Sequence, residues 1–325
     1  MPDRRDFIRT AAAVAVVPAS ALPVVPALAS TPASASASVS ASVAKGPKGR
    51  TGVFRWFGTA GWRVDIGART LLVDPYLSRF DTGLFSGAFR PQTPLTVDAG
   101  AIAARVGRPG TVLVTHTHWD HFADVPHIAT TTGARVVGTL TAYHLGLASG
   151  VPGGQLCPVK GGEVLDFGDH TVEVVASLHS RNAAYSMAFP GVRVSPPPPP
   201  RTIADLPEGD TLSFQLRIAG GPSVFFMGGS DFVERNLAGL DPDVAMVALP
   251  SSTATDDYVP RLIEALGRPK VVVPVHWDNF ETELRNPPQA APADAARLDA
   301  LTAAVRKVSP RTRVVRPEYD TPCTF

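Results

Sequence analysis

The sequence predicts an α/β protein built from two packed β-sheets with helices on their outer faces. Two observations support this fold class. Three short β-rich runs open the folded part of the chain, at residues 53–57, 62–66 and 70–73, with glycines between them. Alternating strand-like and helix-like runs then follow as far as the C-terminus. A single parallel, doubly wound sheet fits less well, because the opening strands lack the crossover helices that parallel strands need.

The later elements are expected from their apolar runs and from the residues that end them. Gly168-Asp169 is a hairpin turn signal between two β-rich runs, and Gly107 and Pro109 close the first helical run. The expected helices span residues 97–106, 125–131, 141–148, 258–266 and 292–305. The expected strands span residues 111–114, 135–137, 163–167, 171–176, 212–218, 223–227, 244–248, 270–273 and 313–315.

The first residues are expected to be a leader rather than part of the fold. The run Asp3-Arg4-Arg5-Asp6-Phe7 resembles a twin-arginine export motif, and Ala27-Leu28-Ala29 matches a small-x-small cleavage pattern. Prolines interrupt the apolar stretch between them, so no stable membrane span is expected. The domain prediction is a signal peptide over 1–29, a Ser/Ala-rich linker over 30–50 and a folded domain over 51–325. We therefore expect export by the twin-arginine machinery to the periplasm, the cell envelope or the medium.

Charge and cysteine content narrow the choice of partners. The formal net charge is +1 at pH 7, which argues against nucleic acid or an anionic membrane as partner and leaves a small-molecule substrate. Cys157 and Cys323 are too few for a disulfide scaffold or a thiolate zinc site. The two could form one bridge or remain free thiols, and the sequence does not choose between these states.

Histidine and aspartate gather directly after a buried apolar run. Residues 116–121 read His-Thr-His-Trp-Asp-His and follow the strand expected at 111–114. Three imidazoles and a carboxylate within six residues exceed what packing requires, and they suit zinc, manganese or iron. His179, Asp231 and His276 each follow a later apolar run. Because one metal needs only three or four ligands, these seven candidates predict two adjacent metal ions.

The spacing of the first ligands predicts their directions. His116 and His118 are two residues apart, so an extended backbone would direct both side chains to one face. Asp120 is expected to continue that face if the chain stays extended. His121 would then point elsewhere and serve a neighbouring ion.

This order of residues resembles the metallo-β-lactamase superfamily over roughly residues 52–317. The resemblance implies an αββα sandwich of two mixed β-sheets flanked by helices, with the metals at one edge. The matching positions are His116, His118 and His179 for the first metal, Asp120, His121 and His276 for the second, and Asp231 for a bridging carboxylate. Three further runs resemble the ascorbate-phosphate-lactonase-like and N-acylphosphatidylethanolamine-phospholipase-like branches: residues 72–75, 179–181 and 274–278.

The resemblance also implies an activity. Two divalent ions, with Zn2+ the expected metal and manganese or iron as alternatives, would lower the pKa of bound water to about 7. The resulting hydroxide would attack an ester, lactone, phosphoester or amide, while Asp120 orients it or takes up a proton. The alternatives are a β-lactamase, against which Asp231 counts, and a non-catalytic metal-binding protein, against which the complete ligand set counts.

Other residues near the ligands have two interpretations each. Asp74 ends a strand before a proline and is either a turn cap or a support for the ligands. Asp278 either orients His276 or caps a solvated loop. Substrate specificity is expected to reside in the loops at 78–95 and 181–207, the second of which contains a run of five prolines.

Overall fold

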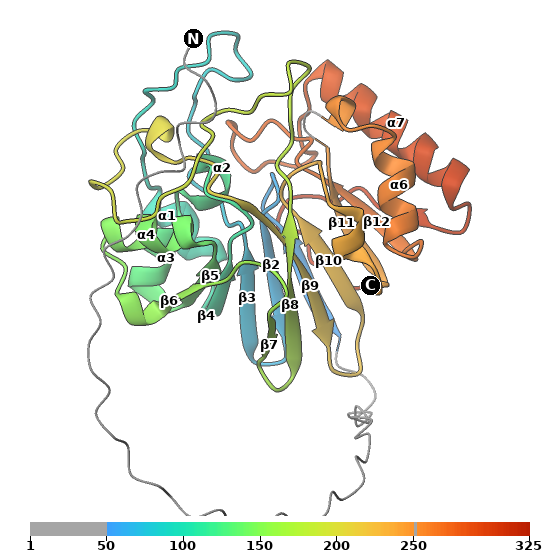
Figure 1. The fold of residues 1–325 in the computed structure, drawn as a ribbon, viewed down its shortest axis with the longest axis horizontal. Coiled ribbons are helices and arrows are strands. Elements are labelled where there is room, and N and C mark those ends of the chain that lie inside the picture. Colours follow the sequence, from blue (N-terminus) through green and yellow to red (C-terminus); the bar gives the residue numbers. More distant parts are fainter. Residues whose placement is uncertain (1–50, 250–251) are drawn as a thin grey trace, which may run out of the picture. The chain divides into compact units, whose positions relative to one another are not determined.

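Two mixed β-sheets pack face to face with helices on their outer sides, which confirms the predicted sandwich (Figure 1). The computed structural model describes residues 51–249 and 252–325. The predicted signal peptide, cleavage site and linker therefore lie outside the described residues. In the described part, no helix combines the length and the apolar character that crossing a bilayer requires.

The first sheet begins as an antiparallel meander and continues as parallel strands. Its order is β1-β2-β3-β4-β5-β6, with antiparallel pairing up to β3 and parallel pairing beyond it. In β2 the side chains of Trp62, Val64 and Ile66 are buried while the residues between them are half-buried, as expected for a strand with one face on the core. The strands are Gly52–Trp56, Trp62–Ile66, Arg69–Val73, Pro109–Leu113, Arg135–Gly138 and Leu156–Pro158.

The second sheet has the order β13-β12-β11-β10-β9-β8-β7. Its β7 to β10 strands pair antiparallel, and its β10 to β13 strands pair parallel. Every residue of β11 and β12 is buried, because these strands have the other sheet on one face and helices on the other. The strands are Val164–Asp166, His170–Ser177, Thr211–Ile218, Ser223–Met227, Val244–Ala248, Val271–Val275 and Arg313–Val314.

The helices cover the outer faces of the sheets. Figure 1 shows α1, α3 and α4 beside the first sheet and α6 and α7 beside the second. One large apolar cluster lies between the sheets and extends beneath α6 and α7, and a second lies between the first sheet and its helices. The helices are Ala99–Arg105, Trp119–Phe122, Val125–Thr132, Leu140–Ala148, Glu234–Leu237, Tyr258–Ala265 and Pro292–Val308.

The sequence did not predict β6, the single-turn helices α2 and α5, or the 3-10 turns at residues 153–155, 203–205 and 252–254. Each of these elements is too short to produce a detectable apolar period. The helix α2 matters most, because it lies within the histidine motif. Asp120 is in its first turn, so the chain does not stay extended and Asp120 does not continue the face of His116 and His118.

The two cysteines lie at opposite edges of the first sheet. Cys157 is in β6, whereas Cys323 pairs with Phe54 of β1. Five strand spacings of about 4.8 Å each separate these edges, far beyond the roughly 7 Å that a disulfide tolerates between Cα atoms. Both cysteines are free thiols.

Candidate metal centre

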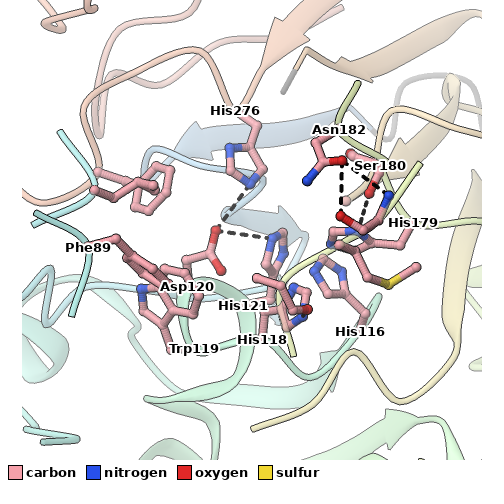
Figure 2. Close-up of a pocket in the computed structure, with 16 residues that line it drawn as sticks. Phe89, His116, His118, Trp119, Asp120, His121, His179, Ser180, Asn182 and His276 are labelled. Atoms are coloured by element: carbon pink, nitrogen blue, oxygen red, sulfur yellow. Dashed lines mark hydrogen bonds and ion pairs between the residues drawn. The ribbon is translucent and has the colours of Figure 1, made fainter. Parts of the chain in front are cut away.

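Six of the seven predicted ligands meet at the carboxyl-end edge of both sheets. They form two groups, in each of which the ligand atoms lie within 4.8 Å of one another: His116, His118 and His179 in the first, and Asp120, His121 and His276 in the second. The groups are adjacent, since the rings of His116 and His121 have centroids 3.9 Å apart. Figure 2 shows these side chains converging from separate segments.

A change of backbone conformation within the motif divides its ligands between the groups. His118 is extended, with φ −60° and ψ 157°, and its carbonyl accepts hydrogen bonds from the backbone N–H groups of His121 and Phe122. The chain therefore turns into α2 directly after His118. Asp120 and His121 leave from this helical turn, and this sends both toward His276 instead of toward His118.

The later ligands come from the ends of strands in the second sheet. His179 follows β8, and His276 follows β12 with a positive φ of 60°. A hydrogen bond of 2.8 Å from the His276 backbone N–H to the Thr59 carbonyl holds this uncommon conformation. Gly228, after β10, lines the same cavity, and a Cβ there would lie 2.1 Å from Thr115 Oγ1, so the close approach requires glycine.

Hydrogen bonds to acceptors orient three of the five imidazoles. His118 Nε2 donates to the Ala188 carbonyl at 2.8 Å, and His179 Nδ1 donates to the Ser180 carbonyl at 2.7 Å. His121 Nδ1 donates to Asp74 Oδ2 at 2.9 Å. Because these ring nitrogens carry the proton, the other nitrogen of each ring keeps its lone pair for a metal.

Asp74 supports the second group, as one of its two interpretations predicted. It is fully buried at a positive φ of 40° and accepts hydrogen bonds from the backbone N–H and the hydroxyl of Thr115, in addition to that from His121. The Thr115 hydroxyl lies 3.1 Å from His116 Nδ1, so it also contacts the first group. The sequence did not single out Thr115, although its place between the strand and the first ligand could have suggested this role.

The donor set fits divalent metal ions. The Nε2 atoms of His116 and His121 are buried and have no hydrogen-bond partner among the described residues. Such buried polar atoms are costly unless they bind something. Imidazole nitrogens with one carboxylate suit zinc, and manganese or iron is also compatible.

The two groups differ in charge. Burial and the neighbouring imidazoles lower the pKa of His116 well below its usual value and the pKa of His179 to about 3. Burial lowers the pKa of His118 to about 4. Burial opposes a charge on His121 too, but Asp120 and Asp74 outweigh it and raise its pKa to about 10. The first group is thus neutral and ready to ligate, whereas in the second the carboxylates of Asp120 and Asp74 favour a cation: without a metal this is a second proton on His121, which a bound metal ion would replace.

Asp231 belongs to neither group, although the sequence assigned it the bridging position. Its backbone pairs with Leu178 in an isolated β-bridge, and its carboxylate accepts a hydrogen bond from the Phe232 N–H at 2.8 Å. It is also absent from the residues that line the cavity over the metal centre. Asp231 was assigned to the bridging position of the family from its order along the chain. In the structure, Gly228 lines the cavity directly after β10, and the chain has left the cavity by residue 231.

Asp278 does not contact His276. It accepts hydrogen bonds from the Thr59 N–H, the Tyr319 hydroxyl and Arg79, with which it forms a buried ion pair at 2.8 Å. Thr59 connects the two residues, because its N–H donates to Asp278 and its carbonyl accepts from the His276 N–H. The solvated-cap interpretation was wrong as well, because Asp278 is buried.

The cavity over the metal centre has a volume of about 350 Å³. Both predicted specificity loops contribute to it. Leu84 and Phe89 come from the first loop, and Met187 and Ala188 come from the second. Trp119 and Phe280 complete the apolar part of the wall.

Comparison with known proteins agrees with this geometry. Residues 69–277 match the family model described as "Beta-lactamase superfamily domain". A UPF0173 metal-dependent hydrolase of Methylobacterium nodulans is 30% identical over 76% of this chain and 90% of its own length. Another from Pyrobaculum calidifontis is 28% identical over 77% of this chain and 93% of its own length.

A solved structure shares the fold. A metallo hydrolase from Ignicoccus hospitalis superposes with a TM-score of 0.54 at 18% identity, covering 85% of this chain and 98% of that one. The sequence relatives and the family model together decide the assignment. The chain belongs to the metallo-β-lactamase superfamily, within the UPF0173 metal-dependent hydrolases.

Proposed function

We propose that this protein is an exported hydrolase that holds two divalent metal ions, most simply zinc, and cleaves an ester, lactone, phosphoester or amide bond. The main support for the proposal is that two groups of three possible ligands lie side by side. Both groups contain buried imidazole nitrogens that have no hydrogen-bond partner among the described residues. When bound, the metals supply a Lewis acid and lower the pKa of coordinated water to about 7.

The protein residues have separate tasks in this proposal. His116, His118 and His179 hold one ion as neutral imidazoles, and Asp120, His121 and His276 hold the other. Asp74 keeps the proton of His121 on Nδ1, so that Nε2 faces the ion. Asp120 Oδ2 lies 3.1 Å from His276 Nε2 and 3.5 Å from His121 Nε2, at the edge of the cavity, where it can also accept a proton from the attacking water.

The position of Asp231 strengthens one alternative. The sequence argument against a β-lactamase rested on Asp231 as a bridging ligand, and that carboxylate lies outside both groups. A cyclic amide therefore remains a candidate substrate. Similarity to the lactonase-like and phospholipase-like branches stays a prediction.

A substrate panel tests the proposal. Metal-replete protein is assayed with bis(p-nitrophenyl) phosphate, a γ-lactone, a p-nitrophenyl ester and nitrocefin, beside His118→Ala. Elemental analysis should give two metals per chain and fewer in the variant. If no substrate is turned over and the variant behaves identically, the non-catalytic metal-binding alternative is correct.

Export is tested separately. Cell fractionation should place the mature protein outside the cytoplasm, and replacement of Arg4 and Arg5 by lysine should retain it inside. Cytoplasmic location of the unaltered protein would contradict this part of the proposal.

A further inference from the structure

Apart from the metal ligands and three uncharged polar residues, Ser180, Asn182 and Ser186, the residues that line the cavity are apolar. Phe89, Trp119 and Phe189 form a cluster of aromatic rings with centroids about 6 Å apart, of which Phe89 and Trp119 line the cavity. On another side, the Phe280 ring lies 5.2 Å from His276 and packs against Phe85. Figure 2 shows Phe89 and Trp119 next to one another, near Asp120.

Large apolar side chains remain exposed at the mouth of this cavity. Leu84 is 46% exposed and Phe89 is 36% exposed, although both belong to a loop that is held in place. Glu281 accepts hydrogen bonds from the backbone N–H groups of Thr82 and Leu84, which ties the loop to the segment after His276. Apolar surface that is kept rigid and open beside a reactive centre indicates contact with an apolar ligand.

The cavity offers no cation to a charged substrate. Among the described residues that line it, none is lysine or arginine. Two arginines in the bordering segments are paired with carboxylates, Arg79 with Asp278 and Arg297 with Asp294, and Arg181 lies outside the lining and donates to the Tyr185 carbonyl. Away from the metals, an anionic group would lose hydration without gaining a partner.

The Asn182 amide presents a neutral hydrogen-bond donor to the cavity. Asn182 Oδ1 accepts hydrogen bonds from the backbone N–H groups of Ala184 and Ser186. These two donors determine the orientation of the side-chain amide, because only its oxygen can accept them. Its nitrogen makes no hydrogen bond within the described residues, and Figure 2 shows it pointing into the cavity. A neutral N–H donor suits the carbonyl oxygen of an ester or lactone.

We infer that the substrate is a small ester or lactone whose acyl part is uncharged and apolar, with Asn182 donating to the carbonyl oxygen. The inference rests on the proposed hydrolase function and specifies its substrate class. The volume of about 350 Å³ lies at the small end of ligand cavities, roughly 300–1,000 Å³, which limits the acyl part to a short chain or a ring.

A matched pair of substrates tests the charge preference. p-Nitrophenyl pentanoate and mono-p-nitrophenyl glutarate share the leaving group and the chain length, but the glutarate ends in a carboxylate. We expect kcat/KM to favour the pentanoate by about 10- to 100-fold, because the carboxylate would be desolvated without a cation. Equal values, or a preference for the glutarate, would overturn the inference while leaving the hydrolase function intact.

Two variants test whether the cavity wall causes the preference for the uncharged substrate. Phe89→Lys places a cation at the mouth of the cavity and should reduce the ratio of kcat/KM for the pentanoate to kcat/KM for the glutarate about tenfold. Tyr185→Lys is the matched control, because Tyr185 is 70% exposed and lies outside the cavity lining, and it should leave the ratio unchanged. If both variants change the ratio equally, overall charge and not the cavity wall sets it.

A binding measurement separates this inference from catalysis. Pentanohydroxamic acid and glutaric monohydroxamic acid present the same chelating group with the same two tails, and calorimetry measures their Kd without turnover. At least about tenfold tighter binding of the neutral compound supports the inference even if no ester is cleaved. Equal affinities, or no binding of either compound to metal-loaded protein, would overturn it.

A separate variant tests whether Asn182 donates to the carbonyl oxygen of the substrate. Asn182→Asp keeps the oxygen that accepts the two backbone hydrogen bonds of the loop but removes the N–H donor. We expect kcat for the pentanoate to fall about 10- to 100-fold with unchanged metal content and melting temperature. An unchanged kcat would remove Asn182 from the proposal.

Discussion

Two buried charged networks lie on either side of Thr59, and they differ in how completely the protein satisfies them. Arg79 and Asp278 are 3% and 0% exposed, and Arg79 also donates to the carbonyls of Phe57 and Asn279. Asp278 accepts two further hydrogen bonds, from the Thr59 N–H and from the Tyr319 hydroxyl. In the metal centre, by contrast, His116 Nε2 and His276 Nδ1 are buried without a hydrogen-bond partner among the described residues.

This difference separates a structural network from a functional one. A buried charge that the chain neutralises by itself holds segments together, as Arg79 and Asp278 hold the loop after β3 against the loop after β12. Buried imidazole nitrogens that lack a hydrogen bond and are grouped with further possible metal ligands suit a ligand from outside. The two networks are alike in burial and charge, and they differ in whether their buried polar atoms have hydrogen-bond partners.

Loss of the Asp120 carboxylate should have the largest effect. Asp120→Asn removes the anionic ligand of the second group, and we expect activity to fall on the order of 10⁴-fold, about 5 kcal/mol of transition-state stabilisation. Metal content should fall from two ions toward one, as measured by elemental analysis. Full activity with two metals bound would contradict the assignment of Asp120.

Breaking the structural network should affect stability but not metal binding. Arg79→Met leaves Asp278 buried without its cation and should lower the free energy of unfolding by about 3–5 kcal/mol, measured by denaturant titration. At a temperature where the variant stays folded, its metal content should equal that of the unaltered protein. Loss of metal without loss of stability would show that the networks are not separate.

The metal-free protein should lose stability as the pH falls below 6.5. The folded-state pKa values of His118 and His179 are lowered to about 4 and about 3, so the unfolded chain binds protons first on acidification. The loss between pH 6.5 and pH 4 should be on the order of 3 kcal/mol for each of these two imidazoles. His121 has the opposite sign, since its raised pKa of about 10 adds stability that disappears as the pH rises from 6.5 through 10. Thermal melts of chelator-treated protein across pH 4–10 should therefore peak near neutrality, and a flat profile would contradict these shifts.

Weakening the support of the second group should have the smallest effect. Asp74→Asn replaces the acceptor of the His121 proton and should reduce metal affinity about 10- to 100-fold, measured by competition with a chelator. Asp65→Asn is the matched control, because Asp65 forms ion pairs with Arg55 and Arg63 away from the cavity. Equal losses of affinity in both variants would mean that overall charge, not the contact with His121, is responsible.

Local sequence was informative wherever a pattern repeats over a few residues. The alternation of Trp62, Val64 and Ile66 predicts one buried face, and the structure buries all three. The turn signal Gly168-Asp169 lies between β7 and β8, as expected for a hairpin. The single turn of α2 was missed because four residues carry too little periodicity to predict a helix.

By itself, the sequence determined the two-layer fold class and a supply of metal ligands at strand ends, because apolar periodicity and ligand chemistry are properties of short segments. Only the tertiary structure decided that Asp120 joins His276, that Asp231 lies outside both groups, and that Asp74 orients His121. It also decided that Cys157 and Cys323 lie at opposite edges of a sheet. These outcomes depend on where segments far apart along the chain come together, and no local pattern carries that information.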